Sequence, residues 1–372
     1  MDVRALLNEI GSVGRPAGSS AESAARMVCT AWLKSAGFEA TEHAFEYSAF
    51  PGRWGMPVTG SALFLIGGVG AAVIAADPGN VNVAMRYAIL MLSVVLAAGW
   101  WMGRYGTRLV PLMRRRGLNL EARRGVPKVW LIAHLDSKSQ PLSLLVRAIG
   151  SVGLACGWIL AIAAWAAVNV LQLPSEIEVV LLALSAAAAL SLAFAWIGEA
   201  GSGALDNASG VASILGAVTL LDSATPVGIV VTSAEELGLA GARTWVAGRL
   251  PCVAINCDGV DDDGPVTITA SGRGRRVWKK LAMSVGLASS VRFKRILPGV
   301  LLDASAFSES GWVACTVSKG ARGSLARIHT RRDTVAALSG SGVEEVQKII
   351  ASIAGAMVER RNAPECRNGG LP

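Results

Sequence analysis

Four long apolar runs dominate the pattern of hydrophobic and polar positions along the chain. Each is close to the about 20 residues that a helix needs to cross the roughly 30 Å hydrocarbon core of a bilayer. Almost no charge interrupts them, and the short polar links DPGNVNVAMR and QLPSEIE join them in pairs. We therefore predict four transmembrane helices in two hairpins; the alternative is four helices of a buried core. The runs are approximately Pro57–Ala76, Tyr87–Met102, Ala148–Leu171 and Ile177–Ile197.

Charges beside these runs predict their orientation. The hairpin tips hold one basic residue, Arg86, together with Asp77, Glu176 and Glu178. Because Lys and Arg gather in cytoplasmic loops, we expect the tips to face away from the cytoplasm and the rest of the chain to face it. The basic residues on the side opposite the tips are Arg53, Arg104, Arg108, Arg114, Arg115, Arg116, Arg123, Arg124, Lys128 and Arg147.

Outside the apolar runs, strand-like and helix-like segments alternate. This alternation predicts an α/β fold with a mixed, mostly parallel sheet sandwiched by helices. The two strands that follow the first hairpin, LNLEARR and KVWLIAH, are expected to be neighbours in the sheet. Helices are expected near residues 21–36, 208–221, 240–248, 275–285 and 343–360, and strands near 38–47, 118–124, 128–134, 227–233, 252–257, 266–270, 291–297 and 312–318.

Chain length suits one large domain with added elements, because single domains commonly reach about 250 residues. We expect that domain to be interrupted twice by the hairpins. Its parts would be residues 1–52, 105–146 and 199–362, the hairpins would be 53–104 and 147–198, and 363–372 would form a C-terminal tail.

Composition supports a membrane protein. The 372 residues are 52% hydrophobic and only 17% charged, and the mean hydropathy is +0.47. The net charge of +8 could suggest nucleic acid, but Arg is not interleaved with aromatic residues and many basic residues flank the apolar runs. We therefore expect lipid and not nucleic acid as the partner.

The cysteines and the N-terminus add a prediction about the compartment. The six cysteines include no CxxC pair, which is typical of isolated thiols in a reducing compartment. The first twenty residues lack the basic-then-apolar pattern of a secretory signal. We expect an integral protein of a bacterial-type inner (plasma) membrane, with its main domain in the cytoplasm. The cysteines are Cys29, Cys156, Cys252, Cys257, Cys315 and Cys366.

Candidate metal ligands follow predicted strands. His134 ends an apolar strand, and Asp136 lies two positions later, so both side chains leave the same face. A carboxylate there could fix the tautomer of a metal-bound imidazole, although a buried structural histidine is at least as common. Asp206, in GALDNASG, precedes a predicted helix, where an anion is stabilised; an ordinary N-cap is the alternative.

Three further sites follow the same rule. Glu235 and Glu236 come directly after a strand, although such a pair is commonly a solvated helix start. Asp258 follows the strand AINC, and His329 lies in RIHTRRDT with Asp333 as a possible partner. Sheets of α/β proteins gather ligands at the carboxyl ends of their strands.

Together, these residues predict a metal centre. The donor set is His134, Asp206, Glu236, Asp258 and His329, with Glu235 and Asp136 left over. Two nitrogens and three carboxylates suit a pair of zinc ions about 3.5–4 Å apart, bridged by one carboxylate.

The motifs, in this order, resemble the co-catalytic di-zinc aminopeptidase family, which includes bacterial leucine aminopeptidases, aminopeptidase Y, glutamate carboxypeptidase and glutaminyl cyclase. GRPAGSSAESAARMVCTAWLKSAGFEATEHAFEY looks like that family's N-terminal helix and strand. The resemblance covers nearly all of the sequence outside the apolar runs. It implies a zinc exopeptidase-like fold with two zinc ions per chain.

Residue roles follow from the same resemblance. It implies that His134 and Asp258 complete separate zinc sites and that Asp206 bridges the two ions. Glu236 and His329 would fill the remaining places. Glu235 would be the general base, and Asp136 would support a metal-bound imidazole.

Two departures from the family pattern stand out. In LLDASAFSESG, Ala304 occupies a position where the family often has His, which affects substrate contacts. About seventy residues, including the second hairpin, separate Asp136 from Asp206, where the family link is short. An even number of membrane crossings keeps both motifs on one side of the bilayer.

We therefore predict a membrane-anchored zinc metallopeptidase, a hydrolase acting as an aminopeptidase on a peptide or aminoacyl substrate. One alternative is one-metal acyl transfer of the glutaminyl cyclase type. The other is a non-catalytic membrane scaffold on a peptidase fold, since a fold does not by itself give a function. Side-chain preference, carboxypeptidase or dipeptidase action and oligomeric state stay open.

Overall fold

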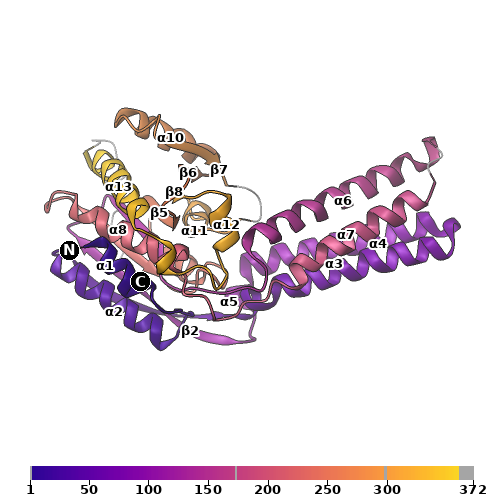
Figure 1. Cartoon of the computed structure of the whole chain (residues 1–372), viewed down its shortest axis with the longest axis horizontal. Coiled ribbons are helices and arrows are strands. Elements are labelled where there is room, and N and C mark those ends of the chain that lie inside the picture. The colour runs from indigo at the N-terminus through magenta and orange to yellow at the C-terminus, as the bar shows by residue number, and fades with distance from the viewer. Residues whose placement is uncertain (1, 172–173, 297–299, 360–372) are drawn as a thin grey trace. The chain divides into compact units, whose positions relative to one another are not determined.

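The computed structural model describes residues 2–171, 174–296 and 300–359, so the expected tail at 363–372 lies outside the described residues (Figure 1). The chain divides into two compact units. Unit 1 is made from Met1–Tyr47, Arg114–Ser139 and Gly198–Pro372, and unit 2 from Ser48–Met113 and Gln140–Ile197.

Unit 1 contains an eight-stranded sheet in the order β1-β2-β4-β3-β5-β8-β6-β7. The central strands β4, β3, β5 and β8 run parallel, whereas β2 and β6 pair antiparallel with β4 and β8. This mixed, mostly parallel sheet was predicted. The strands are β1 (Glu39–Ser48), β2 (Arg114–Arg124), β3 (Val129–His134), β4 (Val227–Thr232), β5 (Val253–Val260), β6 (Val266–Ala270), β7 (Val291–Arg295) and β8 (Val313–Lys319).

One expected pairing is wrong. β2 and β3 follow each other in the chain but are not neighbours, because β4 lies between them. β3 is buried at every position and takes parallel partners on both sides, β4 and β5. A strand inside a parallel sheet has parallel strands on both sides, and for β3 these strands come later in the chain. β2 instead runs antiparallel to β4.

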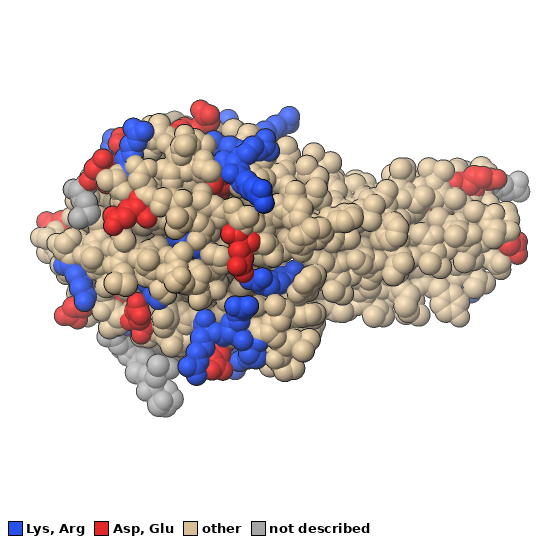
Figure 2. Space-filling model, turned by 60° about the horizontal axis from the view of Figure 1, so that its bottom comes forward, with Lys and Arg blue, Asp and Glu red and all other residues tan. Residues whose placement is uncertain are grey.

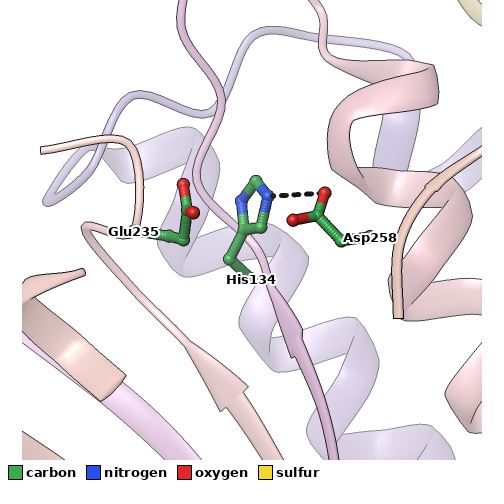
Figure 3. Close-up of side chains that lie close together, drawn as sticks. All are labelled: His134, Glu235 and Asp258. Atoms are coloured by element: carbon green, nitrogen blue, oxygen red, sulfur yellow. Dashed lines mark ion pairs between the residues drawn. The ribbon is translucent and has the colours of Figure 1, made fainter. Parts of the chain in front are cut away.

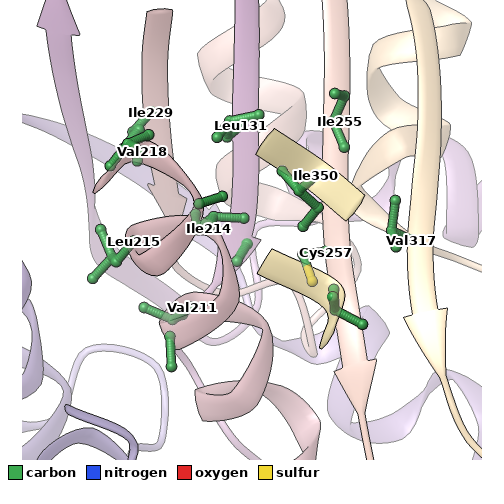
Figure 4. Close-up of a cluster of buried hydrophobic side chains, with 14 of the residues drawn as sticks. Leu131, Val211, Ile214, Leu215, Val218, Ile229, Ile255, Cys257, Val317 and Ile350 are labelled. Atoms are coloured by element: carbon green, nitrogen blue, oxygen red, sulfur yellow. The ribbon is translucent and has the colours of Figure 1, made fainter. Parts of the chain in front are cut away.

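Helices cover both faces of the sheet. On one face Leu131 and Ile255 pack against Ile214 of α8 and Ile350 of α13 (Figure 4). On the other face Trp130 belongs to a second buried cluster that includes residues of α9 and α11. The helices of unit 1 are α1 (Val3–Gly11), α2 (Ser20–Ser35), α8 (Ser209–Thr219), α9 (Ala240–Val246), α10 (Gly272–Ser284), α11 (Asp303–Glu309), α12 (Arg322–Arg327) and α13 (Ser341–Glu359), with the short helical segments η3 (Ala204–Ala208) and η4 (Val335–Ala337).

Unit 2 is helical. Its four long helices are long and apolar enough to cross a membrane, as judged by length and composition alone. In Figure 2 this unit shows almost no charged atoms along its length, and acidic side chains gather at one end. The four expected helices are therefore present, although α3 begins seven residues before Pro57. The elements are α3 (Phe50–Ala76), η1 (Pro78–Asn80), α4 (Val81–Trp101), η2 (Met102–Gly106), α5 (Thr107–Leu109), α6 (Leu144–Leu171) and α7 (Glu176–Ala193).

Small residues let α7 pack closely against both α3 and α6. A Cβ atom on Gly67 of α3 would lie 2.9 Å from the carbonyl oxygen of Leu182, closer than real Cβ contacts. On α6, Gly157 faces the side chain of Ser185. Helices in lipid associate largely through such close van der Waals packing, because lipid tails are as apolar as the side chains.

The cysteines differ from the expectation at one position. Cys29, Cys156, Cys257 and Cys315 are free thiols, as predicted. Cys252 is disulfide-bonded, so the prediction of isolated thiols is wrong for this residue. Spacing along a sequence does not show which cysteines meet in space.

Candidate metal centre

Sheet order brings the predicted ligands to one edge of unit 1. His134 is the last residue of β3 and pairs in register with Thr232, the last residue of β4. Glu235 and Glu236 follow β4 directly, and Asp258 lies near the end of β5 on the other side of β3. Because the three strands are parallel, their carboxyl ends meet at this edge.

The remaining two ligands come from outside these strands. Asp206 lies in η3, immediately before α8, and its peptide bond to Asn207 is cis. His329 follows α12 and has a positive φ of 64°. Both side chains are buried, as are those of His134 and Glu236.

Asp206 stands between the two imidazoles. One of its carboxylate oxygens, Oδ1, lies 3.1 Å from Nε2 of His134, and the other, Oδ2, lies 2.9 Å from Nε2 of His329. His134 Nε2 is also 3.6 Å from Asp258 Oδ1, and His329 Nε2 is 3.3 Å from Glu236 Oε1. All five residues named from the sequence therefore converge in one place.

The donor atoms form two candidate triads, in each of which one atom from every residue lies within 4.8 Å of the others. The first is His134, Glu235 and Asp258, with the imidazole between the two carboxylates (Figure 3). The second is Asp206, Glu236 and His329. The structure thus places His134 and Asp258 in one group, so the assignment of these two residues to separate sites is wrong. The two residues meet because β3 and β5 are adjacent in the sheet, although they are far apart in the sequence.

Asp136 organises the first triad and the glutamate pair. Its carboxylate accepts hydrogen bonds from the backbone N–H groups of Glu235 (3.0 Å) and Glu236 (3.1 Å). Its backbone carbonyl lies 3.0 Å from His134 Nδ1, whereas its carboxylate is 3.8 Å away. Because a carbonyl only accepts, Nδ1 donates to it, and Nε2 is the ring nitrogen that faces Asp206 and Asp258 and would bind a metal. The support expected from the Asp136 side chain thus comes from its main chain.

Asp333 holds the turn that carries Asp206. Its carboxylate oxygens accept hydrogen bonds from the backbone N–H groups of Leu205 (2.6 Å) and Asp206 (3.2 Å). The sequence suggested Asp333 as a partner of His329; the structure shows that it holds the backbone of the neighbouring ligand, Asp206.

Three supporting residues were missed by the sequence analysis. Arg15, fully buried, donates hydrogen bonds of 2.8 Å to the carbonyls of Leu135 and Gly203, one beside each ligand turn. Asn119 accepts from the backbone N–H of Ser233 (3.0 Å), just before the glutamate pair. Lys138 Nζ lies 2.5 Å from Glu236 Oε2. Lys138, two positions after Asp136, is the only one that spacing could have indicated.

Negative charge is concentrated at this centre, and the pKa shifts reflect it. Burial, with the negative charges of Glu236 and Asp258 added, raises the pKa of Glu235 well above its ordinary range. For Glu236, burial acts in the same direction, but the ammonium of Lys138 and the imidazole of His329 together hold the pKa at about 2. Burial would lower the pKa of His134, yet Glu235, Asp206 and Asp258 raise it well above its ordinary value. Buried carboxylates in this number favour the binding of cations.

The residues fit a pair of zinc ions. Imidazole nitrogen and carboxylate oxygen are ordinary zinc ligands, and catalytic zinc sites keep one position open for water or substrate. The two triads contribute four carboxylates, whose charge two divalent cations would balance. Asp206 can face both ions because its two oxygens point to different imidazoles.

Comparisons with known proteins indicate a peptidase family and a shared fold. Residues 190–354 match the profile of peptidase family M28. A search of curated proteins found no significant match. Solved structures with a similar fold include the zinc aminopeptidase BSAP from Bacillus subtilis, with 12% identity, a TM-score of 0.55 and coverage of 98% of this chain and 96% of that one.

Two more structures with a similar fold are an aminopeptidase and a glutaminyl cyclase. The aminopeptidase from Aneurinibacillus sp. strain AM-1 has 13% identity and a TM-score of 0.53 over 100% of this chain and 96% of that one. The glutaminyl cyclase from Bacteroides thetaiotaomicron has 11% identity and a TM-score of 0.54 over 95% of this chain and 96% of that one. The predicted resemblance and the zinc exopeptidase-like fold are therefore confirmed.

Proposed function

Because residues 190–354 match peptidase family M28, we propose that the chain is a membrane-anchored zinc metallopeptidase that acts as an aminopeptidase. The observation that carries the proposal is the position of Asp206, whose two carboxylate oxygens face His134 and His329 at 3.1 and 2.9 Å. A carboxylate in this position would be available to two metal ions at once.

We assign the ligands from these contacts. His134, Asp258 and Asp206 would hold one zinc ion, and Asp206, Glu236 and His329 the other. Two bound zinc ions would supply Lewis acidity, polarising the scissile carbonyl and acidifying water. Lys138, paired with Glu236 Oε2, keeps Glu236 ionised and leaves Oε1 facing His329 as the ligand atom.

Glu235 is assigned the proton transfers. Its side chain lies beside His134 and belongs to the first triad, so it can also approach a metal there (Figure 3). Burial raises its pKa, which favours a carboxylate that takes a proton from water and returns it to the leaving amine. General acid–base catalysis of this kind typically contributes about 10²–10⁴-fold.

Asp136 acts through its neighbours. By accepting from the backbone N–H groups of Glu235 and Glu236, its carboxylate sets the directions of the proposed base and of a proposed ligand. Its carbonyl fixes the tautomer of His134. It is therefore a positioning residue for both glutamates and one imidazole.

Unit 2 is assigned to the membrane. Its four helices are apolar over membrane-spanning lengths, and their faces pack through small residues. The chain enters unit 2 twice and each time passes through two long helices, so an even number of crossings returns it to the same side. The loop charges favour a cytoplasmic position for unit 1.

One-metal acyl transfer is the second candidate. Glutaminyl cyclase structures share the fold at a TM-score comparable with those of the aminopeptidases. The proposed two-metal hydrolysis requires two zinc ions per chain, whereas the second candidate requires one.

The test uses the full chain purified in detergent. Zinc per chain would be measured by mass spectrometry, and turnover would be followed with aminoacyl anilides and with a peptide carrying N-terminal glutamine. We expect two zinc ions, aminoacyl release, loss of activity on chelation and recovery on adding zinc. One zinc ion with cyclisation of the glutaminyl peptide would favour the second candidate. Absence of both reactions in zinc-loaded protein would leave a non-catalytic scaffold.

A further inference from the structure

One segment of unit 1 carries the entire net charge of the protein. Residues 264–302 contain eight Lys and Arg residues and no Asp or Glu. The whole chain has 35 basic and 27 acidic residues, so outside this segment 27 basic residues face 27 acidic ones. The excess of positive charge is therefore local and not a general property of the surface.

The structure puts these charges on an outward surface. α10 buries Trp278, Leu281 and Ala282 in the core of unit 1, and its opposite side faces solvent. β7 is the last strand of the sheet and has β6 as its one partner there. In Figure 1, α10 lies on the outside of unit 1. We name six exposed residues the basic face: Arg276, Lys279 and Lys280 on α10, Arg295 on the side of the edge strand β7 that also carries Phe293, and Arg292 and Lys294 on the other side of that strand.

Two ordinary explanations do not account for this face. Charged residues on an edge strand prevent strand-to-strand aggregation, but this applies to β7 and not to α10. Binding of nucleic acid single strands uses aromatic side chains on which bases stack. Trp278, the aromatic residue of α10, is only 1% exposed, and Phe293 of β7 packs against the core.

The basic residues are also available to a partner. Among the described residues, no member of the basic face pairs with a carboxylate. The apolar side of α10 is already used by the protein core, so this helix cannot insert into hydrocarbon as an interfacial helix does. Any contact with a membrane would be made with the headgroups and would depend on charge.

We infer that the basic face binds anionic phospholipid headgroups. The inference rests on the proposed membrane anchoring of unit 2. Unit 1 is joined to unit 2 by four chain connections, which keep headgroups at a high local concentration. The proposed orientation places unit 1 beside the cytoplasmic leaflet, whose anionic lipids attract clusters of Lys and Arg. Such lipids would orient unit 1 relative to the membrane and so influence which substrates reach the metal centre.

Lysine footprinting in nanodiscs tests the inference. The full chain would be reconstituted into discs of phosphatidylcholine alone, or of phosphatidylcholine mixed with phosphatidylglycerol, and labelled with an amine-reactive reagent. We expect Lys279, Lys280 and Lys294 to be labelled about threefold or more slowly in the anionic discs, and the difference to disappear at about 1 M salt, where the Debye length is about 3 Å. Lys34, exposed on α2, is the internal control and should not change.

Charge reversal provides the matched variants. Replacing Arg276, Arg292 and Arg295 by Glu, on α10 and on both sides of β7, should abolish the slower labelling of Lys279, Lys280 and Lys294 in anionic discs. Replacing Arg4, Lys34 and Lys348 by Glu alters the net charge by the same amount and should leave the slower labelling in anionic discs unchanged. Circular dichroism and zinc content show whether each variant is folded.

Equal labelling in both kinds of disc would overturn the inference. So would slower labelling on adding single-stranded DNA to neutral discs with no response to phosphatidylglycerol, which would indicate nucleic acid as the ligand. These outcomes differ from a failure of the proposed anchoring, in which alkaline carbonate would extract the chain from membranes. They are also independent of peptidase activity.

Discussion

Arg15 donates a hydrogen bond of 2.8 Å from its guanidinium to the backbone carbonyl of Gly203, which lies 188 residues later in the chain. The same side chain donates to four other carbonyls, including that of Leu135, next to His134. One buried cation thus connects the N-terminal loop with the turns that carry His134 and Asp206. The metal centre therefore depends on Arg15, although none of the hydrogen bonds of Arg15 goes to a proposed ligand.

Replacing Arg15 by Met should therefore destabilise unit 1. Several buried carbonyls would lose their donor, and we expect a loss of about 3 kcal/mol or more, together with weaker zinc binding. Thermal unfolding and zinc titration would measure both effects. Arg15→Lys keeps a charge but not the planar set of donors, so it should restore little. Arg4→Met, at an exposed position, is the control, and equal stability of the two Met variants would contradict the prediction.

Glu235 and Glu236 are adjacent but should respond differently to the same substitution. Glu235→Gln should retain zinc and lose about 10²–10⁴-fold in kcat, because the amide cannot take a proton from water. Glu236→Gln should instead lower the zinc content, since it removes a charged ligand. Metal analysis and single-turnover kinetics on both variants would separate the roles. An undiminished rate for Glu235→Gln removes it from the mechanism.

Asp136→Asn tests the positioning role. The carboxylate accepts one hydrogen bond at each oxygen, and an asparagine side chain has a single acceptor, so one backbone N–H of the glutamate pair would lose its partner. We expect a loss of about 10–100-fold in zinc affinity or activity. Asp2→Asn, at an exposed helix cap, should leave both unchanged. If Asp136→Asn binds zinc and turns over like the parent protein, Asp136 does not position the site.

The helical unit offers a pair of adjacent glycines for comparison. A Cβ atom at Gly67 would meet the carbonyl oxygen of Leu182 at 2.9 Å, whereas one at Gly68 would meet nothing within 4 Å. Gly67→Leu should force α3 and α7 apart and lower the melting temperature in detergent, and Gly68→Leu should not. Size-exclusion profiles and thermal unfolding of both variants give the measurement. A similar loss in both would show that the close contact is unimportant.

Stability should fall at high pH because of Cys29. Burial raises the pKa of its thiol to about 12, from 9.0 for an unperturbed thiol, so the folded state holds the proton more tightly than the unfolded state. Above pH 9 the unfolded chain releases this proton, whereas the folded chain keeps it. The free energy of unfolding therefore falls by about 1.4 kcal/mol per pH unit until the pKa of about 12 is reached. Cys29→Ala should show a shallower decline in melting temperature over this range. Parallel curves for the two proteins would contradict the assignment.

Much of this protein could be predicted from local pattern. The four apolar runs predict four long helices from their length and lack of charge. This prediction needs no knowledge of the fold, because a membrane-spanning helix is one continuous segment of the chain. The strands β3 and β4 could be predicted for a similar reason, since each is a short continuous segment without a polar side chain before its last residue. The ligand residues were recognised because each follows such a strand or lies in a motif of recognisable spacing.

Only the tertiary structure decided how these pieces meet. Placing β4 between β2 and β3, and β5 beside β3, depends on contacts between segments far apart in the chain, and it is this order that groups His134 with Asp258. The contacts of Arg15 and the pairing of Lys138 with Glu236 could not be read locally, because a hydrogen bond or an ion pair depends on distances of about 3 Å that no spacing along the chain defines. The sequence alone determined which residues could bind metal, and the fold determined which of their atoms face one another.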